Sequence, residues 1–290
     1  MPANAVPTRT PGRASGGGLT RRDLLRALTA VAAGTAVGGS AFGFLYERHQ
    51  IEITRTSLSV AGLPDGLAGL RGGFLTDLHR SSTVPAELIR SAVQLLMQEK
   101  PDLIVLGGDY VTHGQRRFVP LVAEDLAPLS APHGVFAVLG NHDDDRDMPA
   151  ALANRGIEVL RDARTRLTLR GETLDILGIR YWTRKLSDLT RLARGAAPAT
   201  MFVAHTPARL TEAAQLGLPM MLSGHTHGGQ VVLPGLGAVA ARHFPIIAGH
   251  GSLENTSAFV SRGVGTVYVP VRLRCPPEVA ILTLRPADVS

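Results

Sequence analysis

Five short apolar segments of this chain each end in a polar side chain that can bind a metal ion. They are Phe74–Asp77, Ile104–Asp109, Val138–His142, Phe202–His205 and Leu222–His227. An apolar run of this length is typical of a buried strand, and open α/β sheets carry their chemistry at the carboxyl ends of their strands. We therefore expect the five polar ends to converge. They would bring together carboxylate, amide and imidazole groups without a thiol, which suits manganese, iron or zinc.

The pattern elsewhere predicts an α/β body. Weak alternation predicts a strand over 51–60, and a helical stripe of apolar residues predicts a helix over 85–100. The other expected elements follow in chain order: strands 70–76 and 103–106, helix 119–127, strand 134–139, helix 148–155 with Asp147 as N-cap, a hairpin of 166–170 and 173–178, strand 200–204, helix 207–216 and strand 219–223. Strands 70–76, 103–106 and 134–139 with their helices form a βαβαβ run.

After Gly229 the chain becomes rich in strand-forming residues. Strands are predicted at 231–233, 258–261, 266–271 and 279–284. Because strands outnumber helices there, we expect a second sheet in this part of the chain. No internal repeat and no linker divides the body.

Composition and charge narrow the function. The chain has 290 residues and is 44% hydrophobic, enough for one large α/β domain. Cys275 is the only cysteine, which excludes an internal disulfide and a thiolate metal site. The net charge of +6 is concentrated at the amino end, since residues 1–48 hold six arginines against one aspartate and one glutamate. The remaining residues carry only +2, so no nucleic-acid partner is expected.

The amino-terminal segment resembles an export signal. Residues 1–19 are rich in small and polar residues and are expected to be disordered. Arg21 and Arg22 precede an uncharged stretch from Ala27 to Tyr46, which is typical of a twin-arginine signal. About 20 uncharged residues can also span a bilayer, so cleavage and retention as a membrane anchor both remain open. We expect a leader over 1–46, a catalytic domain over 47–290, recognition by the twin-arginine translocase and an extracytoplasmic location.

The order of the polar motifs resembles the calcineurin-like metallophosphoesterases over nearly all of residues 68–285. The motifs are Asp77-Leu-His79, Gly108-Asp109, Gly140-Asn141-His142-Asp143, His205 and Gly224-His225-Thr-His227. The resemblance implies a four-layer α/β/β/α sandwich of two mixed sheets flanked by helices. It also implies two metal sites, one held by Asp77, His79, Asp109 and His227 and the other by Asp109, Asn141, His205 and His225.

A narrower likeness is to bacterial exported or membrane-associated phosphodiesterases. This branch includes pyrophosphatases of the UDP-2,3-diacylglucosamine type. The likeness rests on Gly228-Gly229-Gln230, the Ser-Arg-Gly-x-Gly run at 261–265 and the Pro-Pro-Glu run at 276–278. It implies a phosphate-containing small molecule or a lipid-linked compound as substrate, with the amino-terminal segment at a membrane.

The residue types fit these roles physically. Both oxygens of Asp109 can bind, so it can bridge two cations about 3.5–4 Å apart. The glycines around His225 and His227 permit a bent loop, which would aim both rings at neighbouring ions. Asn141 offers a neutral oxygen, and the side chain beside it, His142, can point to the substrate as a general acid.

These features predict hydrolysis of a phosphodiester or pyrophosphate. Two divalent ions against two carboxylates leave a positive site that favours an anion, and a hydroxide shared by the metals would be the nucleophile. The alternatives are a phosphomonoesterase and a non-catalytic exported metal-binding module. Arg180, His113 and His250 are weak candidates for substrate binding, and the acidic run 143–147 is interpreted as a helix cap.

Overall fold

The computed structural model describes residues 21–287 and divides into two compact units, Met1–Gly39 and Ser40–Ser290. Helix α1 (Arg21–Leu45) begins in the first unit and ends in the second. The predicted disorder of 1–19 lies outside the described residues. Among the helices of the described part, none combines the length and apolarity needed to cross a membrane.

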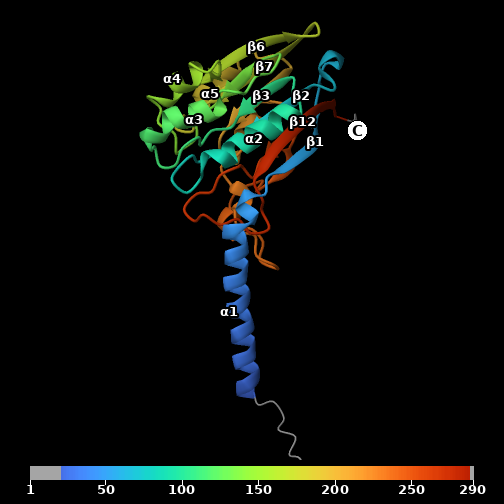
Figure 1. Ribbon diagram of the computed structural model, residues 1–290. Coiled ribbons are helices and arrows are strands. Elements are labelled where there is room, and N and C mark those ends of the chain that lie inside the picture. The colour runs from blue at the N-terminus through green and yellow to red at the C-terminus, as the bar shows by residue number, and fades with distance from the viewer. Residues whose placement is uncertain (1–20, 288–290) are drawn as a thin grey trace, which may run out of the picture. The chain divides into compact units, whose positions relative to one another are not determined.

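The second unit contains two six-stranded mixed sheets (Figure 1). The first has the order β1-β12-β2-β3-β4-β5 and the second β10-β11-β9-β8-β7-β6. Strands of the first sheet are β1 (Glu52–Val60), β2 (Arg71–Leu75), β3 (Leu103–Leu106), β4 (Val135–Ala137), β5 (Glu158–Val159) and β12 (Glu278–Pro286). Strands of the second are β6 (Ala163–Leu169), β7 (Glu172–Ile179), β8 (Ala199–Ala204), β9 (Met220–Ser223), β10 (Gly249–Leu253) and β11 (Thr256–Val260).

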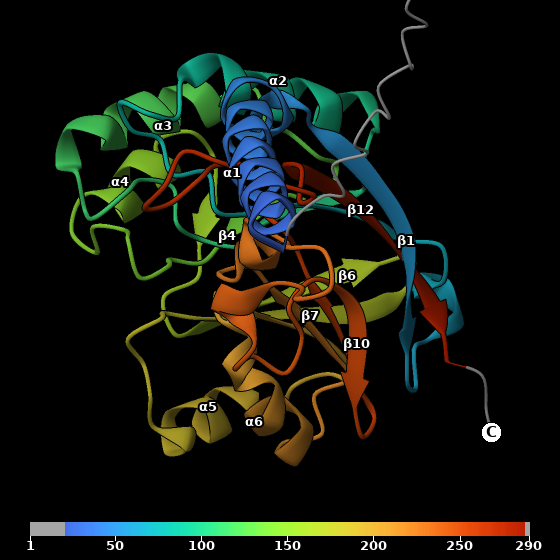
Figure 2. The same cartoon turned by 90° about the horizontal axis from the view of Figure 1, so that it is seen from below.

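Helices cover the outer face of each sheet. They are α2 (Ala86–Gln98), α3 (Val119–Leu126), α4 (Met148–Ala153), α5 (Leu186–Ala193) and α6 (Leu210–Gln215). Short 3-10 turns are η1 (Glu47–His49), η2 (Asp65–Leu67), η3 (Arg116–Phe118), η4 (Pro207–Arg209), η5 (His227–Gly229) and η6 (Val239–Ala241). Figure 2 shows α2, α3 and α4 on one side of the paired sheets and α5 and α6 on the other. The predicted α/β/β/α sandwich is confirmed.

Three apolar clusters hold the layers together. One lies between the first sheet and α2–α4, one between the two sheets, and one between the second sheet and α5–α6. Strand β12 contributes side chains to two of these clusters, because successive side chains of a strand point to opposite faces of the sheet. Val279 and Ile281 enter the helix-side cluster, while Ala280, Leu282 and Leu284 enter the cluster between the sheets. An uninterrupted apolar strand is therefore buried on both faces.

Most predicted elements are present within two or three residues of their expected ends. Strands β2, β3 and β4 are parallel, as the βαβαβ run requires, and β6 and β7 form the expected antiparallel hairpin. Asp147 is the residue before α4, but its side chain makes no cap hydrogen bond and faces Arg116 instead. Strands β5 and β10 and helix α5 were not predicted. Helix α5 has apolar residues at helical spacing, but it is only eight residues long, which is shorter than the window over which helical periodicity can be recognised.

The expectation for the carboxyl-terminal part was wrong in two ways. Segments 231–233 and 266–271 form no strand; the first makes only isolated bridges, Val231 with Leu273 and Leu233 with Gly237. Strand β12 does not join a carboxyl-terminal sheet; it inserts into the first sheet, parallel to β1 and antiparallel to β2. The second sheet is drawn from residues 163–260. Local propensity cannot show where β12 inserts, because its pairing partners in β1 and β2 lie more than 200 residues earlier in the chain.

The interface between the sheets provides a stability test. Phe74 of β2 and Phe259 of β11 meet edge to face there, with ring centroids 6.5 Å apart, and both are buried. We expect Phe259→Ala to lower the free energy of unfolding by about 3–5 kcal/mol, because it leaves a cavity between two layers. Urea denaturation measures this. The control Leu121→Ala, at an exposed position of α3, should change it by less than about 0.5 kcal/mol; equal effects would contradict the proposed packing role.

Candidate metal centre

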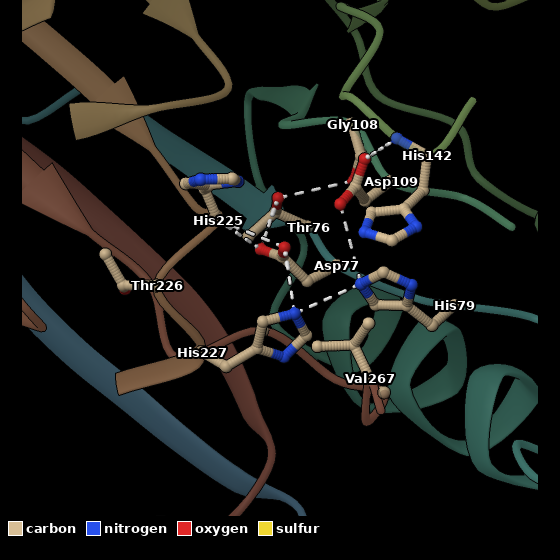
Figure 3. A network of polar contacts seen from close by, with 12 residues as sticks. Thr76, Asp77, His79, Gly108, Asp109, His142, His225, Thr226, His227 and Val267 are labelled. Carbon is tan, nitrogen blue, oxygen red and sulfur yellow. Dashed lines mark hydrogen bonds and ion pairs between the residues drawn. The ribbon is translucent and has the colours of Figure 1, made fainter. Parts of the chain in front are cut away.

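The carboxyl ends of five strands from both sheets meet at one place. Asp77 follows β2, Asp109 follows β3 and Asn141–His142 follow β4, all in the first sheet; His205 follows β8 and His225 follows β9 in the second. Figure 3 shows Asp77, Asp109 and His79 facing His227 and His225 across the gap between the two sheets. The expected convergence of the polar strand ends is therefore present.

The backbone turns sharply at these positions. Five of the seven predicted ligands have a positive φ: Asp77 (54°), His79 (50°), Asp109 (57°), His225 (72°) and His227 (51°). Side chains other than glycine rarely adopt this conformation, which costs about 1–3 kcal/mol at each residue and is found mainly at functional sites. The chain thus leaves each strand in a bend that aims the side chain inward, including the bend expected at His225 and His227.

One triad consists of Asp77, His79 and His227, whose ligand atoms lie within 4.8 Å of one another. The Nε2 atoms of His79 and His227 face each other at 3.1 Å, and Asp77 Oδ1 lies 3.4 Å from His227 Nε2. Distances of this size are expected between atoms that share a cation through bonds of about 2 Å.

The second triad consists of Asp109, His205 and His225. His205 Nε2 lies 3.2 Å from both Asp109 Oδ2 and His225 Nδ1. The same Asp109 Oδ2 lies 3.5 Å from His79 Nε2 of the first triad. One carboxylate oxygen therefore stands between the two triads, the position that a shared ligand would occupy.

Two buried polar atoms at this centre have no hydrogen-bond partner. They are Asn141 Oδ1 and His227 Nδ1. Unpaired buried polar atoms are rare and costly. Asn141 lies between Gly140 and His142, which both contact Asp109, so its unpaired amide oxygen fits a cation ligand. The nitrogen and oxygen donors suit manganese, iron or zinc. The two triads are consistent with a dimetal centre.

Burial and neighbouring charges set the protonation of the cluster. Burial raises the pKa of Asp77 to about 6 and lowers the pKa of His79 to about 3 and of His225 to about 4. Burial also opposes the charge on His205, but the carboxylates of Asp109 and Asp77 outweigh it and raise the His205 pKa to about 10. His79 and His225 are therefore neutral near pH 7, with lone pairs available to a cation, whereas His205 would have to release its proton on binding one.

His142 lies beside the triads in a defined tautomer. Its Nδ1 accepts the backbone N–H of His113 at 3.0 Å, so the proton of the neutral ring is on Nε2. Its own backbone N–H donates to Asp109 Oδ1 at 2.8 Å, and its ring centroid is 5.0 Å from that of His79. Burial lowers the pKa of His142. The ring thus presents an N–H donor next to the centre.

Asp143 supports the centre in a way that the sequence did not reveal. Its carboxylate accepts the backbone N–H groups of Asp109 (2.8 Å), Tyr110 (2.7 Å) and Gly140 (2.8 Å). It therefore fixes the strained turn at Asp109 and is no helix cap. The capping interpretation of 143–147 holds only for Asp144, which accepts the N–H groups of the two residues before α4.

Close packing explains two glycines of the motifs. A Cβ at Gly140 would lie 2.0 Å from Asp109 Oδ1, and one at Gly265 would lie 2.2 Å from the carbonyl oxygen of Leu78. Gly265 also donates its N–H to the Asp77 carbonyl at 2.7 Å. The Ser-Arg-Gly-x-Gly run thus packs directly behind the first triad.

A buried arginine and the single cysteine hold this run and the His227 turn. Arg272 is fully buried and donates to the carbonyl groups of Gly263, Gly265 and Cys275, among others. The Cys275 thiol donates to the His227 carbonyl at 3.1 Å. Its N–H donates at 2.7 Å to the carboxylate of Glu47, a buried residue just after α1. Nothing in the local sequence around Glu47 or Arg272 indicates these roles.

The weak substrate-binding candidates are placed differently from one another. Arg180 is engaged by Asp162 (2.7 Å) and Asp145 (3.3 Å), which leaves little of its guanidinium for a second phosphate. His113 is exposed, and its ring lies 4.8 Å from that of His142. His250 is in strand β10, opposite Phe259. Among the three, His113 is the one beside the centre.

Comparison with known proteins agrees with this geometry. The sequence profile of the calcineurin-like phosphoesterases matches residues 70–229. The chain is 32% identical to phosphodiesterase YaeI of Escherichia coli, over 92% of this chain and 99% of that protein. It is 28% identical to the uncharacterized metallophosphoesterase YkuE of Bacillus subtilis, over 92% and 98% of the two chains.

Among solved structures, the NAD nucleotidase of Haemophilus influenzae superposes with a TM-score of 0.47 at 13% identity. The match covers 67% of this chain and 45% of that one. The matched profile and the relatedness to YaeI over nearly the whole length decide the classification. The chain belongs to the calcineurin-like phosphoesterase family of metal-dependent phosphoester hydrolases.

Proposed function

We propose that the chain hydrolyses phosphodiester or pyrophosphate bonds with two divalent cations, held by the seven predicted ligands. The observation that carries the proposal is the position of Asp109 Oδ2, 3.5 Å from His79 Nε2 and 3.2 Å from His205 Nε2. An uncharged residue could fill a purely structural role at this position at lower cost, since burying charge is unfavourable. The carboxylate between the two triads therefore supports a role in metal binding. Two bound cations would activate water and neutralise charge on the phosphate.

The chain's own residues would orient the substrate and move a proton. His142 Nε2–H is available to donate to a phosphate oxygen or to the leaving group, because the His113 N–H occupies Nδ1. Asp143 and Gly140 keep the Asp109 turn rigid, so its carboxylate does not have to reorganise during the reaction. The relatedness to a phosphodiesterase supports a diester over a monoester as the preferred substrate.

Substrate preference tests this function. With added Mn²⁺, we expect bis(p-nitrophenyl) phosphate to be hydrolysed with a kcat/KM at least about tenfold above that of p-nitrophenyl phosphate, since only the diester has a second substituent for the protein to bind. Release of p-nitrophenol measures both rates. A preference for the monoester would favour the phosphomonoesterase alternative, and turnover of neither compound by the metal-loaded protein would favour the non-catalytic module.

Substitution of His142 separates proton transfer from metal binding. We expect His142→Ala to lower kcat by roughly 10²–10⁴ while two metal ions per chain remain bound, because its backbone N–H still supports Asp109. Asp109→Asn should instead lose metal, as shown by elemental analysis of the purified protein. His133→Ala, at a partly exposed histidine before β4, is the matched control and should keep both. Normal turnover of His142→Ala would remove this residue from the mechanism.

The amino-terminal segment is proposed to direct export of the folded protein through the twin-arginine pathway. Arg21 and Arg22 are the first residues of α1 and are exposed. We expect Arg21→Lys with Arg22→Lys to leave folded, metal-loaded protein in the cytoplasm, because the translocase reads the arginine pair. Cell fractionation measures this, with Arg9→Lys and Arg13→Lys as the control pair.

Export of the Arg21→Lys, Arg22→Lys variant would indicate a general secretory signal or an anchor. Sequencing of the mature amino terminus decides whether the segment is cleaved.

A further inference from the structure

An apolar groove opens directly from the candidate metal centre. Its cavity has a volume of about 440 Å³, within the range of small-molecule sites, and both His225 and His227 line it. The other lining side chains are mostly aliphatic or aromatic, namely Val231, Leu233, Val239, Phe244, Val267 and Val269. Figure 3 shows Val267 next to His227. Because two candidate metal ligands line the groove, a group attached to a phosphate at the centre would lie beside it.

The groove is built by specific contacts. The buried Gln230 donates its amide N–H groups to the carbonyls of Val267 (3.2 Å) and Val269 (2.8 Å) and accepts the Val267 N–H (2.9 Å). These bonds fix one wall to the turn that carries His227. The other wall packs equally closely, since a Cβ at Gly229 would meet Ala238 Cβ at 2.3 Å. Both walls are thus tied to the turn that carries His227.

The mouth of the groove leaves apolar side chains in water. Leu233 is 38% exposed, Val239 49% and Val269 52%, and Tyr268 beside them is 81% exposed. Scattered exposed apolar residues are ordinary, but a contiguous set rimming a cavity marks a binding surface. Because this rim continues into the metal centre, the occupant is expected to be part of the substrate itself.

A second cavity next to His225 has different chemistry. Its volume is about 430 Å³, and its lining includes Tyr181, Arg184 and His243, with Arg209 paired to Glu212. Arg184 lies over the Tyr181 ring, 5.8 Å from its centroid. His225 and Phe244 line both cavities. The two substituents of a diester bound at the centre would therefore have two adjacent cavities available, one apolar and one with basic and aromatic side chains.

We propose that the substrate is an amphiphilic phosphodiester whose hydrocarbon chain lies in the groove between Val239 and Val269 and whose polar substituent lies beside Arg184. This inference rests on the proposed function, since it places the phosphate at the metal centre. It names the class of substrate and the residues that select it.

Chain length is the direct test. We would compare kcat/KM for methyl and hexyl p-nitrophenyl phosphate with Mn²⁺, each below its micelle concentration. The hexyl ester should be favoured at least about tenfold, because burying even part of each added methylene is favourable. Calorimetric binding of the inert methyl and hexyl esters of methylphosphonic acid should show the same preference.

Variants that place a charge in the groove test whether it binds the hydrocarbon chain. Val239→Asp and Val269→Asp, on the two walls, should each reduce the hexyl-to-methyl ratio to less than about threefold, whereas Leu121→Asp, with a similar exposure of 47%, should keep it. Both wall positions are half exposed, and thermal melting confirms that each variant folds. If one wall variant does not fold, the other decides.

The outcomes separate this inference from the function on which it rests. Equal kcat/KM for the two esters, or a preference that both wall variants retain, would overturn the groove assignment and leave the diesterase proposal standing. Turnover of neither ester would contradict the diesterase proposal. In that case, the calorimetric preference for the hexyl phosphonate, or its absence, still decides whether the groove binds a hydrocarbon chain.

Discussion

Two carboxylates, Asp77 and Asp109, are fully buried among imidazole rings where the two sheets meet, and this arrangement constrains the rest of the fold. Buried charges are tolerated only when they are paired or bind metal ions. The cluster draws its partners from the ends of five strands in both sheets. The sandwich must therefore hold its two layers in a fixed register, and the apolar cluster between the sheets, with Phe74 against Phe259, provides this register.

Support for the centre comes largely from the carboxyl-terminal third of the chain. Strand β12 returns to the first sheet, and the loops before it carry Gly265 and Arg272 behind Asp77 and His227. Cys275 then links the His227 carbonyl to Glu47, at the amino-terminal edge of the catalytic body. Two hydrogen bonds therefore connect the residue just after α1 with the turn that carries a candidate ligand. The compact unit begins at Ser40, a few residues before the domain boundary that the sequence predicts.

The surroundings of the centre are chemically asymmetric. The metal-ligating residues alone would suit any phosphoester. The cavities beside the centre determine which substituents on the phosphate can be bound. Here one flank is apolar and fixed by Gln230, and the other is basic and aromatic. Gly228-Gly229-Gln230 thus has a double effect, because it bends the His227 turn and anchors the groove wall that begins beside it.

The sequence by itself determined the layers of the fold and predicted seven ligands, six of which form the two triads. Both follow from local patterns: apolar runs that end in polar side chains, and motifs in a fixed order. It could not place β12 in the first sheet, identify Asp143 as the support of the Asp109 turn, or show that Arg180 is held by Asp162 and Asp145. It did not reveal the groove either. These features depend on contacts between segments far apart in the chain, and only the packing of the tertiary structure decides which segments meet.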